Sequence, residues 1–288
     1  MRESPFVSVV VPTSNRAELL TRCVESLRRQ DYPAGSFELI VVDNGSTDHT
    51  PLLLHALGEL PRLPEIRSLR LARRDANSAR NAGVDAARGD PICIVDDDVL
   101  APPGWLAALV AGALRHPDAG CLGGPIRILT GNRSSRCAQH PTAGMTFDEG
   151  AHEKVVGEIW GGNMAVRRSA LAAVGPFREG LPRQQEWEWE QRLLECGGHM
   201  VYVPDAWLWH VGARSRTLTE AFMRGYMIGG RRTSTPPARA ARYVAGAVAH
   251  AARARCRQGL VEGARHTGLL LGIVAARLRE RRKPSRPG

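Results

Sequence analysis

Three consecutive carboxylates, Asp96, Asp97 and Asp98, follow directly on the apolar run PICIV at residues 91–95. Like charges that are held close together repel one another, and burial makes this repulsion stronger, so a cation is expected among them. Because alternate side chains of an extended segment point the same way, Asp96 and Asp98 should share a face while Asp97 points away. Two oxygen ligands on one face suit Mg²⁺ or Mn²⁺. The triplet therefore predicts a divalent metal site, with a solvated acidic turn as the alternative interpretation.

The first half of the chain alternates continuous apolar runs, typical of buried strands, with segments of helical periodicity. Asn15 and Glu18 are spaced like a pair that caps the first helix. Strands that are apolar throughout and separated by helices predict an α/β fold with a mostly parallel sheet covered on both faces. The expected strands are residues 7–11, 38–42, 66–71 and 91–95, and the expected helices are residues 17–27, 77–88 and 105–115.

Polar residues gather at the points where the expected strands end. PTSN (12–15) follows the first strand, DNGSTD (43–48) follows the second, and the acidic triplet follows the fourth. In parallel α/β sheets, ligands bind beyond the carboxyl ends of the strands. The sequence therefore predicts a binding site at this edge of the sheet.

The second half of the chain has fewer clear elements, and residues 116–160 show no long period. Residues 161–175 (GGNMAVRRSALAAVG) indicate a loop and a short helix, and residues 185–198 (QEWEWEQRLLECGG) indicate a helix ended by glycine. Residues 199–210 (HMVYVPDAWLWH) indicate a closing strand and turn.

In their order along the chain, the segments VVVPTSNR, VVDNGSTD, NSARNAGVDAARGD, VDDDV and GGNMAVRRSAL resemble glycosyltransferase family 2. The segment QEWEWEQRLLECGGHMVYVPDAWLWH continues this resemblance, which covers roughly residues 6–212. It implies a GT-A fold, in which a Rossmann-like, mostly parallel central sheet is flanked by helices. The implied GT-A domain is 1–213, with a nucleotide-binding half at about 6–124 and an acceptor-binding half at about 125–213.

The function that the resemblance implies is metal-dependent, inverting transfer of a sugar from a nucleotide-sugar donor to a hydroxyl acceptor. The acceptor would be a glycan, a lipid-linked sugar or a small-molecule glycoside. A UDP-sugar is the first expectation for the donor, with dTDP- and GDP-sugars also compatible, and the cofactor would be Mg²⁺ or Mn²⁺. A processive synthase is disfavoured because the chain has no Q-x-x-R-W motif. A nucleotidyltransferase would carry a glycine-rich basic loop after the first strand, where this chain has PTSNR.

The resemblance also assigns residues to the nucleotide and the metal. Asp43 would accept a hydrogen bond from a nucleobase N–H, and Arg80 would reach the base or the diphosphate. Asp98 is expected to bind the metal, Asp96 to help hold the ribose or the ion, and His210 matches a metal-binding histidine of some relatives. The alternatives are a turn role for Asp43, a surface role for Arg80 and a structural role for His210. The expected nucleotide-binding residues are Pro12, Thr13, Asn15, Arg16, Asp43, Asn77, Arg80, Asp96 and Asp97.

The catalytic base is where the sequence departs from the family pattern. Relatives commonly carry Glu-Asp before the helix that ends in glycine, whereas this chain has Gln185 and Glu186 there. Glu186 would then take the proton of the acceptor hydroxyl, with Glu188 as a supporting carboxylate or second candidate. One alternative is that acidic residues in a first helical turn merely complement the helix dipole. Another is a non-catalytic GT-A module that binds a nucleotide sugar or a partner and has lost its base.

Candidates for contacts to the acceptor or donor sugar lie in the second half and include aromatic rings, on which the apolar face of a sugar could stack. They are Trp160, Gly162, Asn163 and Trp187. Trp187 and Trp189 are two residues apart on the expected helix and cannot both face the same way, so at least one should lie in the core.

Charge is unevenly distributed along the 288 residues, whose net formal charge is +10. Residues 211–288 carry 17 Lys and Arg against 3 Asp and Glu, while residues 1–210 carry 22 against 26. The expected C-terminal extension, 214–288, is therefore a basic helical segment that suits peripheral contact with an anionic membrane surface, or else a solvated appendage. Nucleic acid is not expected as a partner, because the extension has few aromatic residues for base stacking.

The sequence favours a cytoplasmic protein, which the basic extension could hold at the cytoplasmic face of the membrane. It shows no signal-peptide pattern, and its longest apolar stretch, 268–276, is far shorter than the ~20 residues that a membrane span needs. The six cysteines form no C-x-x-C pair and are expected to be reduced core thiols rather than disulfides or zinc ligands.

Overall fold

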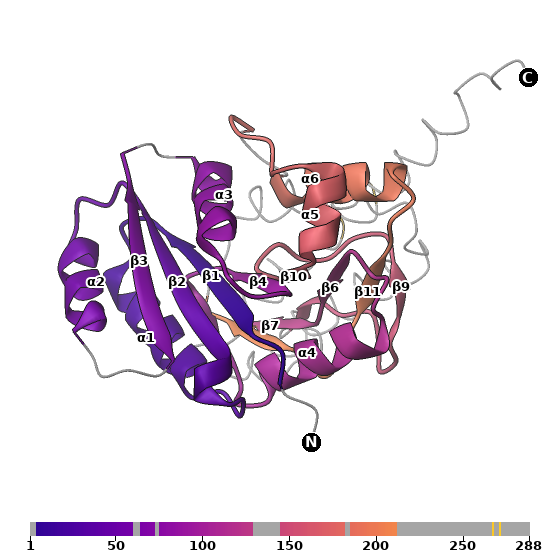
Figure 1. Ribbon diagram of the computed structural model, residues 1–288, viewed down its shortest axis with the longest axis horizontal. Coiled ribbons are helices and arrows are strands. Elements are labelled where there is room, and N and C mark those ends of the chain that lie inside the picture. Colours follow the sequence, from indigo (N-terminus) through magenta and orange to yellow (C-terminus); the bar gives the residue numbers. More distant parts are fainter. Residues whose placement is uncertain are drawn as a thin grey trace, which may run out of the picture. The chain divides into compact units, whose positions relative to one another are not determined.

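The computed structural model divides the chain into two compact units. The first comprises Met1–Leu129 and Met145–Gly212 and contains every helix and strand given below (Figure 1). The expected basic extension, 214–288, lies outside the described residues apart from Thr267 and Leu271. The described residues are 4–59, 64–72, 75–128, 145–181 and 185–211, together with Thr267 and Leu271.

The central sheet has eight strands in the order β3-β2-β1-β4-β10-β6-β11-β9. Strands β1 to β4 are parallel neighbours, β10 runs antiparallel to both β4 and β6, β11 is parallel to β6, and β9 is antiparallel to β11. All strands except β10 and β9 therefore point the same way, which confirms the expected α/β class with a mostly parallel sheet. The bounds are β1 (Val7–Thr13), β2 (Phe37–Asn44), β3 (Glu65–Leu71), β4 (Ile92–Val95), β6 (Cys121–Gly123), β9 (Lys154–Val156), β10 (Asn163–Val166) and β11 (Met200–Tyr202).

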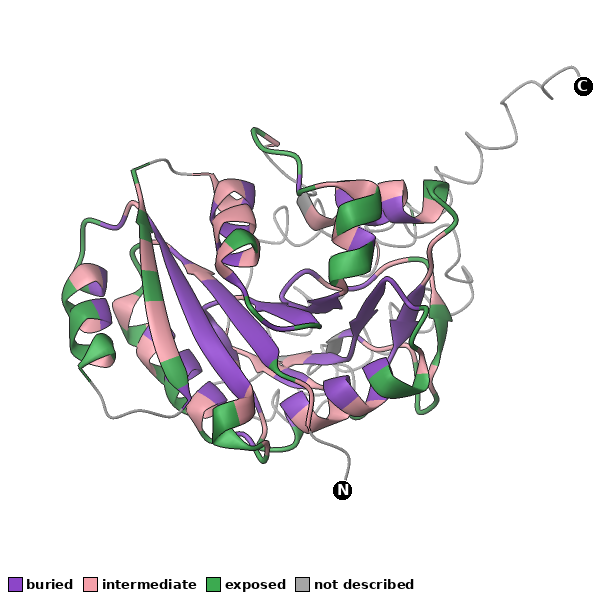
Figure 2. Cartoon of the chain, in the orientation of Figure 1, coloured by how far each residue is buried: buried purple, intermediate pink, exposed green. Residues whose placement is uncertain are grey.

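Helices cover both faces of this sheet, as Figure 1 shows. Val9 and Val11 of β1 pack in one core cluster with α1, α2 and α4, whereas Val10 packs in another with α3, α5 and α6. Because both faces are covered, β1, β2 and β4 are buried along almost their whole length (Figure 2), which is why their sequences are apolar throughout. The helices are α1 (Ala17–Arg28), α2 (Thr50–Gly58), α3 (Ala76–Ala86), α4 (Trp105–Arg115), α5 (Arg168–Val174) and α6 (Gln185–Glu195), with a 3₁₀ turn η1 (Ala34–Ser36) before β2.

A second, four-stranded sheet has the order β5-β12-β7-β8, with bounds β5 (Val99–Leu100), β7 (Ile126–Ile128), β8 (Met145–Phe147) and β12 (Leu208–His210). Strand β5 begins directly after the acidic triplet, and β12 pairs antiparallel with it so that His210 lies opposite Val99. The backbone N–H of Val211 also donates to the carbonyl oxygen of Asp98 at 2.7 Å. This pairing carries His210 to the end of the acidic triplet.

Two expectations for the second half are wrong. NMAV, expected within a loop, is β10, and it lies fully buried between β4 and β6. HMVYVPDAWLWH, expected as one strand and turn, contains β11 and β12, which belong to different sheets. A run of three or four residues carries too little periodicity to reveal a strand, and these strands form only through pairing with distant segments.

Two further expectations concern cysteines and membrane spans. Cys23, Cys93 and Cys121 are free and buried, which confirms the prediction of core thiols for these three residues. Cys196 is a free thiol as expected, but it is exposed, so its expected place in the core is wrong. Cys137 and Cys256 lie outside the described residues. Among the described helices, none combines the length and apolar character needed to cross a bilayer.

A buried acidic network holds β1, β2 and β3 together away from the site. The Glu38 carboxylate in β2 is fully buried and accepts hydrogen bonds from Ser8 Oγ (2.7 Å), Arg67 Nη1 (2.9 Å) and the backbone N–H of Arg88 (2.9 Å). Burial alone would raise the pKa of Glu38, but the hydrogen bonds from Ser8, Arg67 and Arg88 outweigh it and hold the pKa below its ordinary value of 4.5.

We expect Glu38→Gln to lower the free energy of unfolding at pH 7 by roughly 3 kcal/mol, because two arginines then lose a buried charged partner. A lowered pKa contributes stability above the unfolded pKa, and this contribution is lost as pH falls through the folded pKa. The difference between wild type and variant should therefore shrink below about pH 4.5 in denaturant titrations at several pH values. The matched control is Glu65→Gln, an exposed partner of Arg88 that should change stability by less than about 1 kcal/mol. Equal effects of the two variants, or a pH-independent difference, would contradict the prediction.

Candidate active site

The loop after β1 is tied to the acidic triplet through Asp97. Thr13 Oγ1 donates to Asp97 Oδ2 at 2.6 Å, and Arg16 Nη1 donates to Asp97 Oδ1 at 2.9 Å and to Asp98 Oδ2 at 3.0 Å. Asp97 thus turns toward Thr13 and Arg16, and Asp98 shares the Arg16 contact. Residues 97 and 98 form a turn, so the extended segment on which the expected alternation was based is not present. The Asp97 side chain is engaged by the protein itself, so Asp97 fixes the loops on which Thr13 and Arg16 stand.

Asn15 joins the loop after β1 to the loop after β2. Its φ is +55°, its Oδ1 accepts from the backbone N–H of Thr47 (2.7 Å) and Asp48 (3.2 Å), and its own N–H donates to Ser46 Oγ at 2.8 Å. The expected cap of the first helix by Asn15 is therefore wrong: the N-cap position is Arg16, which makes no side-chain cap. The Asn15 side-chain oxygen, which was expected to cap the helix, instead accepts hydrogen bonds from the backbone of the loop after β2.

Asp43 lies at the carboxyl end of β2 with its side chain fully buried. Its Oδ1 accepts from the backbone N–H of Ser46 at 2.8 Å, whereas Oδ2 has no hydrogen-bond partner and lies 3.6 Å from Arg70 Nε. A buried acceptor without a partner is uncommon in folded proteins and suits a ligand donor. Pro12 is close by, half-buried in β1 beside Val42 of β2.

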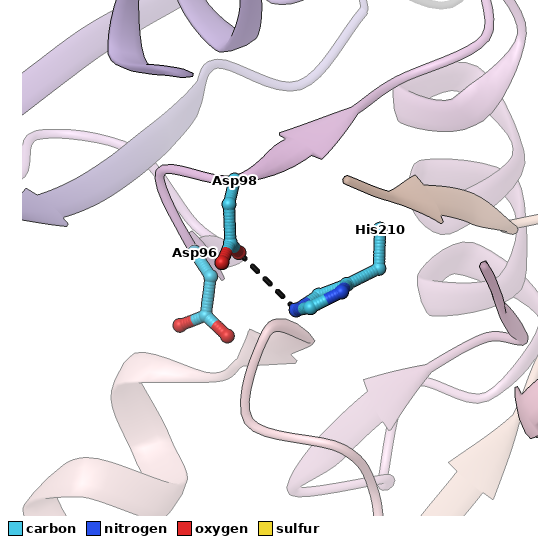
Figure 3. A group of neighbouring side chains, drawn as sticks. All are labelled: Asp96, Asp98 and His210. Carbon is cyan, nitrogen blue, oxygen red and sulfur yellow. Dashed lines mark ion pairs between the residues drawn. The ribbon is translucent and has the colours of Figure 1, made fainter. Parts of the chain in front are cut away.

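Asp96, Asp98 and His210 form a group whose ligand atoms all lie within 4.8 Å of one another. His210 Nε2 is 3.3 Å from Asp98 Oδ1, and Figure 3 shows these two side chains pointing toward each other with Asp96 beside them. Asp98 Oδ1 is buried and accepts no hydrogen bond within normal geometry. Two carboxylates and an imidazole are a donor set that Mg²⁺ or Mn²⁺ accepts, so the residues fit the expected metal.

The electrostatics of the group favour a cation. The pKa of Asp96 is raised to about 7, first because the surrounding protein removes water from its carboxylate, an effect that Arg80 opposes. Repulsion from Asp98, Glu186 and Asp97 raises it further. The pKa of Asp97 is also raised, chiefly by burial, although Thr13 and Arg16 counteract the shift. A bound cation would lower the pKa of both carboxyl groups and so favour their ionised forms.

Arg80 lies between the acidic group and the start of α6. Its Nη2 is 3.9 Å from Asp96 Oδ1 and 3.9 Å from Glu186 Oε2, and the guanidinium is largely buried. Asn77, also buried, orients it: Asn77 Oδ1 accepts from Arg80 Nη1 at 2.9 Å, and Asn77 Nδ2 donates to the Arg178 carbonyl oxygen at 2.6 Å. Glu186 is 31% exposed, so its carboxylate is open to solvent at the rim of the group.

Glu188 points elsewhere. Both of its oxygens accept from Arg192 at 3.0 Å, and Arg178 lies 3.4 Å away. The structure thus brings Glu186, and not Glu188, to Arg80 and Asp96. On the same helix Trp189 is fully buried and donates to the Gly175 carbonyl oxygen at 2.9 Å, while Trp187 is half-buried. The expectation that one of these two tryptophans lies in the core is confirmed.

Residues 160–163 form a turn that enters β10. The N–H of Asn163 donates to the Trp160 carbonyl oxygen at 2.8 Å. The fully buried Asn163 amide accepts from Trp105 Nε1 at 2.8 Å and donates to the Ala206 carbonyl oxygen at 2.8 Å. Both the oxygen and the nitrogen of the Asn163 amide are therefore hydrogen-bonded within the fold. The N–H that bonds Ala206 is not available for the expected contact with a sugar. Trp160 is half-buried and Gly162 lies against Asp96.

Two residues next to the site were not among the expected ones. Arg70 reaches Asp43 because β2 and β3 are in a register that pairs these two residues, and only a correct strand register would have revealed it. Gly161 lies against Glu186. The two consecutive glycines before Asn163 are the sequence feature that could have indicated a close approach of the backbone here.

Comparison with known sequences places this chain in a family. Residues 8–175, more than half of the chain, match the model described as Glycosyl transferase family 2. Glycosyltransferase AglE of Haloferax volcanii is 26% identical over 202 residues, which cover 70% of this chain and 65% of that protein. Validoxylamine A glucosyltransferase of Streptomyces hygroscopicus subsp. jinggangensis is 37% identical over 107 residues, which cover 37% of this chain and 25% of that protein. The chain thus spans less than two thirds of the length of either relative.

Solved structures share the fold at low sequence identity. The mannosyltransferase PcManGT from Pyrobaculum calidifontis, in complex with GDP-Man and Mn²⁺, gives a TM-score of 0.64 at 18% identity and covers 97% of this chain and 89% of that chain. S. aureus TarS 1–349 in complex with UDP-GlcNAc gives a TM-score of 0.59 at 17% identity and covers 95% of this chain and 73% of that chain. These likenesses confirm the expected GT-A fold. The match over residues 8–175, in turn, shows that the chain belongs to glycosyl transferase family 2.

Proposed function

We propose that this protein is a metal-dependent, inverting glycosyltransferase that moves a sugar from a nucleotide-sugar donor to a hydroxyl acceptor. The observation that carries the proposal is that a group of possible metal ligands lies next to a carboxylate that could act as the base. Asp96, Asp98 and His210 offer metal ligands within 4.8 Å of one another, and Arg80 lies 3.9 Å from both Asp96 and Glu186. A donor-binding group and a solvent-open carboxylate thus lie side by side.

The relatives support the donor class and the cofactor. PcManGT was solved with GDP-Man and Mn²⁺, and TarS with UDP-GlcNAc. Asp98 is the first metal ligand in the proposal, with Asp96 and His210 beside it. Mg²⁺ or Mn²⁺ held there would neutralise the negative charge that develops on the departing diphosphate. Arg80 and Arg16 are cationic side chains next to the same carboxylates and suit contacts with the diphosphate or the base.

In the proposed reaction Glu186 accepts the proton of the acceptor hydroxyl. The acceptor oxygen then forms a bond to the anomeric carbon, while the bond from that carbon to the diphosphate oxygen breaks. A single displacement of this kind inverts the configuration at the anomeric carbon and needs no covalent enzyme intermediate. Glu188, which is paired with Arg192 and Arg178, takes a supporting role through the position of α6.

Asp43 and Arg70 are placed to recognise a nucleobase by the hydrogen-bonding groups on one of its edges. The free Asp43 Oδ2 would accept a ring N–H, and the Arg70 guanidinium beside it would donate to an adjacent carbonyl oxygen. Uracil, thymine and guanine present an N–H next to a carbonyl, whereas adenine and cytosine do not. This pairing is compatible with a UDP-, dTDP- or GDP-sugar, of which a UDP-sugar remains the first choice.

The division of labour along the chain is also part of the proposal. Residues 6–124 would bind the nucleotide, and residues 125–213 would bind the acceptor, with the half-buried Trp160 and Trp187 as candidate stacking surfaces. The acceptor would be a glycan, a lipid-linked sugar or a small-molecule glycoside. The basic residues 214–288 would contact an anionic membrane surface, and the protein would act in the cytoplasm.

The experiment is thermal-shift binding of wild-type protein against UDP, dTDP, GDP, ADP and CDP, with Mn²⁺ or with EDTA. One of the first three should stabilise the protein in a Mn²⁺-dependent way, by about 2.7 kcal/mol at a hundredfold excess over its Kd. ADP and CDP should give little stabilisation. Mn²⁺-dependent nucleotide binding without sugar transfer to any acceptor would favour the non-catalytic module. No stabilisation by any nucleotide would overturn the proposed donor class.

A further inference from the structure

Gly161 and Gly162 stand immediately before β10, and their backbone does not require glycine. Neither has a φ in the left-handed region, so an L-residue could adopt the same conformation. The reason for glycine at these positions must therefore lie in the space around the missing side chains.

That space is filled by two carboxylates of the site. A Cβ at Gly161 would lie 2.5 Å from Glu186 Cγ and 2.6 Å from Glu186 Cδ. A Cβ at Gly162 would lie 2.4 Å from Asp96 Oδ2 and 2.9 Å from Asp96 Cγ. Such distances are far below van der Waals contact between carbon and carbon or oxygen, so each glycine leaves room for one carboxylate.

The turn that carries the two glycines is anchored and cannot easily retreat. The backbone of Asn163 closes the turn on the Trp160 carbonyl oxygen, and its buried amide is bonded to Trp105 and to the Ala206 carbonyl oxygen. The Asp96 and Glu186 side chains are 36% and 31% exposed, so they have solvent to move into. An added methyl group would therefore displace the carboxylate rather than the backbone.

We propose that Gly161 and Gly162 are positioning residues, each serving a different carboxylate. Gly161 sets the position of Glu186, which accepts the proton, and Gly162 sets the position of Asp96 in the metal-binding group. The inference rests on the proposed function for the roles of Glu186 and Asp96. It adds that two adjacent backbone positions fix the separation between the donor-binding group and the base.

The test compares Gly161→Ala and Gly162→Ala with Gly157→Ala. Gly157 is exposed, and a Cβ there would meet nothing within 4 Å, so this variant should match wild type. Gly161→Ala should lower kcat by about 100-fold, as a displacement near 1 Å of a reacting group can do, while the Kd of the Mn²⁺–nucleoside diphosphate stays within about twofold. Gly162→Ala should weaken that Kd, measured by calorimetry, by about 10-fold or more.

A double-mutant comparison separates positioning from a general loss of folding. If the methyl group at position 161 acts only by displacing the base, it should have little left to act on in a Glu186→Gln background, where the base is already lost. Gly161→Ala should therefore lower kcat far less in Glu186→Gln than in wild type. Additive losses would mean that the methyl group and Glu186 do not interact.

Crystal structures of the two alanine variants keep the inference testable if wild type proves inactive. Each should show its own carboxylate displaced and the turn at Asn163 unmoved. If the carboxylates are displaced, and the wild-type protein binds Mn²⁺ and nucleotide but transfers no sugar, the proposed function is wrong. The positioning roles of the two glycines would still be supported. Unmoved carboxylates, equal losses of binding and turnover in both variants, or wild-type behaviour of both would overturn the inference.

Discussion

Glu186→Gln is expected to slow sugar transfer severely and to leave Mn²⁺-dependent nucleotide binding intact. Glutamine keeps the shape of glutamate but cannot take a proton, and general-base catalysis typically contributes 10²–10⁴-fold, so kcat should fall by about that factor. Binding should persist because Glu186 is not one of the three residues that offer metal ligands, and its contact with Arg80 is long, at 3.9 Å. The measurement pairs initial rates of transfer with thermal-shift titration of the nucleotide.

Two variants on the same helix sharpen this result. Glu195→Gln changes an exposed carboxylate at the end of α6 and should leave the rate unchanged. Glu188→Gln tests the second candidate: because Glu188 is held by Arg192 and Arg178, we expect a smaller loss of rate than for Glu186→Gln. A larger loss in Glu188→Gln would move the base to that residue. Full activity of Glu186→Gln would refute the proposed mechanism.

Asp98→Ala is expected to remove both Mn²⁺-dependent nucleotide binding and transfer. Asp98 contributes the buried Oδ1 of the proposed metal-binding group, and without it only Asp96 and His210 remain as ligands. Loss of residues that only orient a metal ligand typically weakens metal affinity by 10–100-fold, so loss of a ligand itself should weaken it by at least about 100-fold. The measurement is Mn²⁺ titration by calorimetry in the presence of the nucleoside diphosphate.

The fold should survive this substitution. Arg16 keeps its ion pair with Asp97, and the hydrogen bond between Val211 and Asp98 uses only the backbone oxygen of Asp98. Asp118→Ala, at an exposed aspartate between α4 and β6, is the matched control and should bind Mn²⁺ and nucleotide as wild type does. Unchanged Mn²⁺-dependent binding in Asp98→Ala would contradict the hypothesis that the acidic triplet binds a divalent metal.

The parallel half of the fold could be predicted because its signals are local. Strands such as β1 and β2 are buried on both faces and so are apolar along their length, and α4 was expected at the residues where it is found. The convergence of Asp43 and the acidic triplet at one edge followed from the direction of the strands alone. Asp96 and Asp98 lie in one group with His210, as expected, but Asp98 also shares Arg16 with Asp97, because residues 97 and 98 form a turn and not the extended segment that the prediction assumed.

The remaining features depend on contacts between distant segments, which local patterns do not encode. The antiparallel insertion of β10 between β4 and β6 is set by pairing across the sheet and not by its four residues. Asn15 has the spacing of a helix cap, but the loop after β2 offers it backbone donors that no local rule reveals. The contact of Gly161 with Glu186 likewise joins two segments whose spacing in the sequence carries no signal.

The pairing of β12 with β5 has a consequence for the order in which the site is made. His210 is synthesised more than a hundred residues after Asp98, and at 5–20 residues per second the delay is on the order of ten seconds. During that interval a nascent chain carries the two aspartates of the metal-binding group without the histidine. The group can close only when β12 docks beside Val99, at the end of the described domain. If the proposed metal site is correct, capture of the ion by all three ligands requires the finished domain, and ribosome-bound chains that end before residue 208 should lack it.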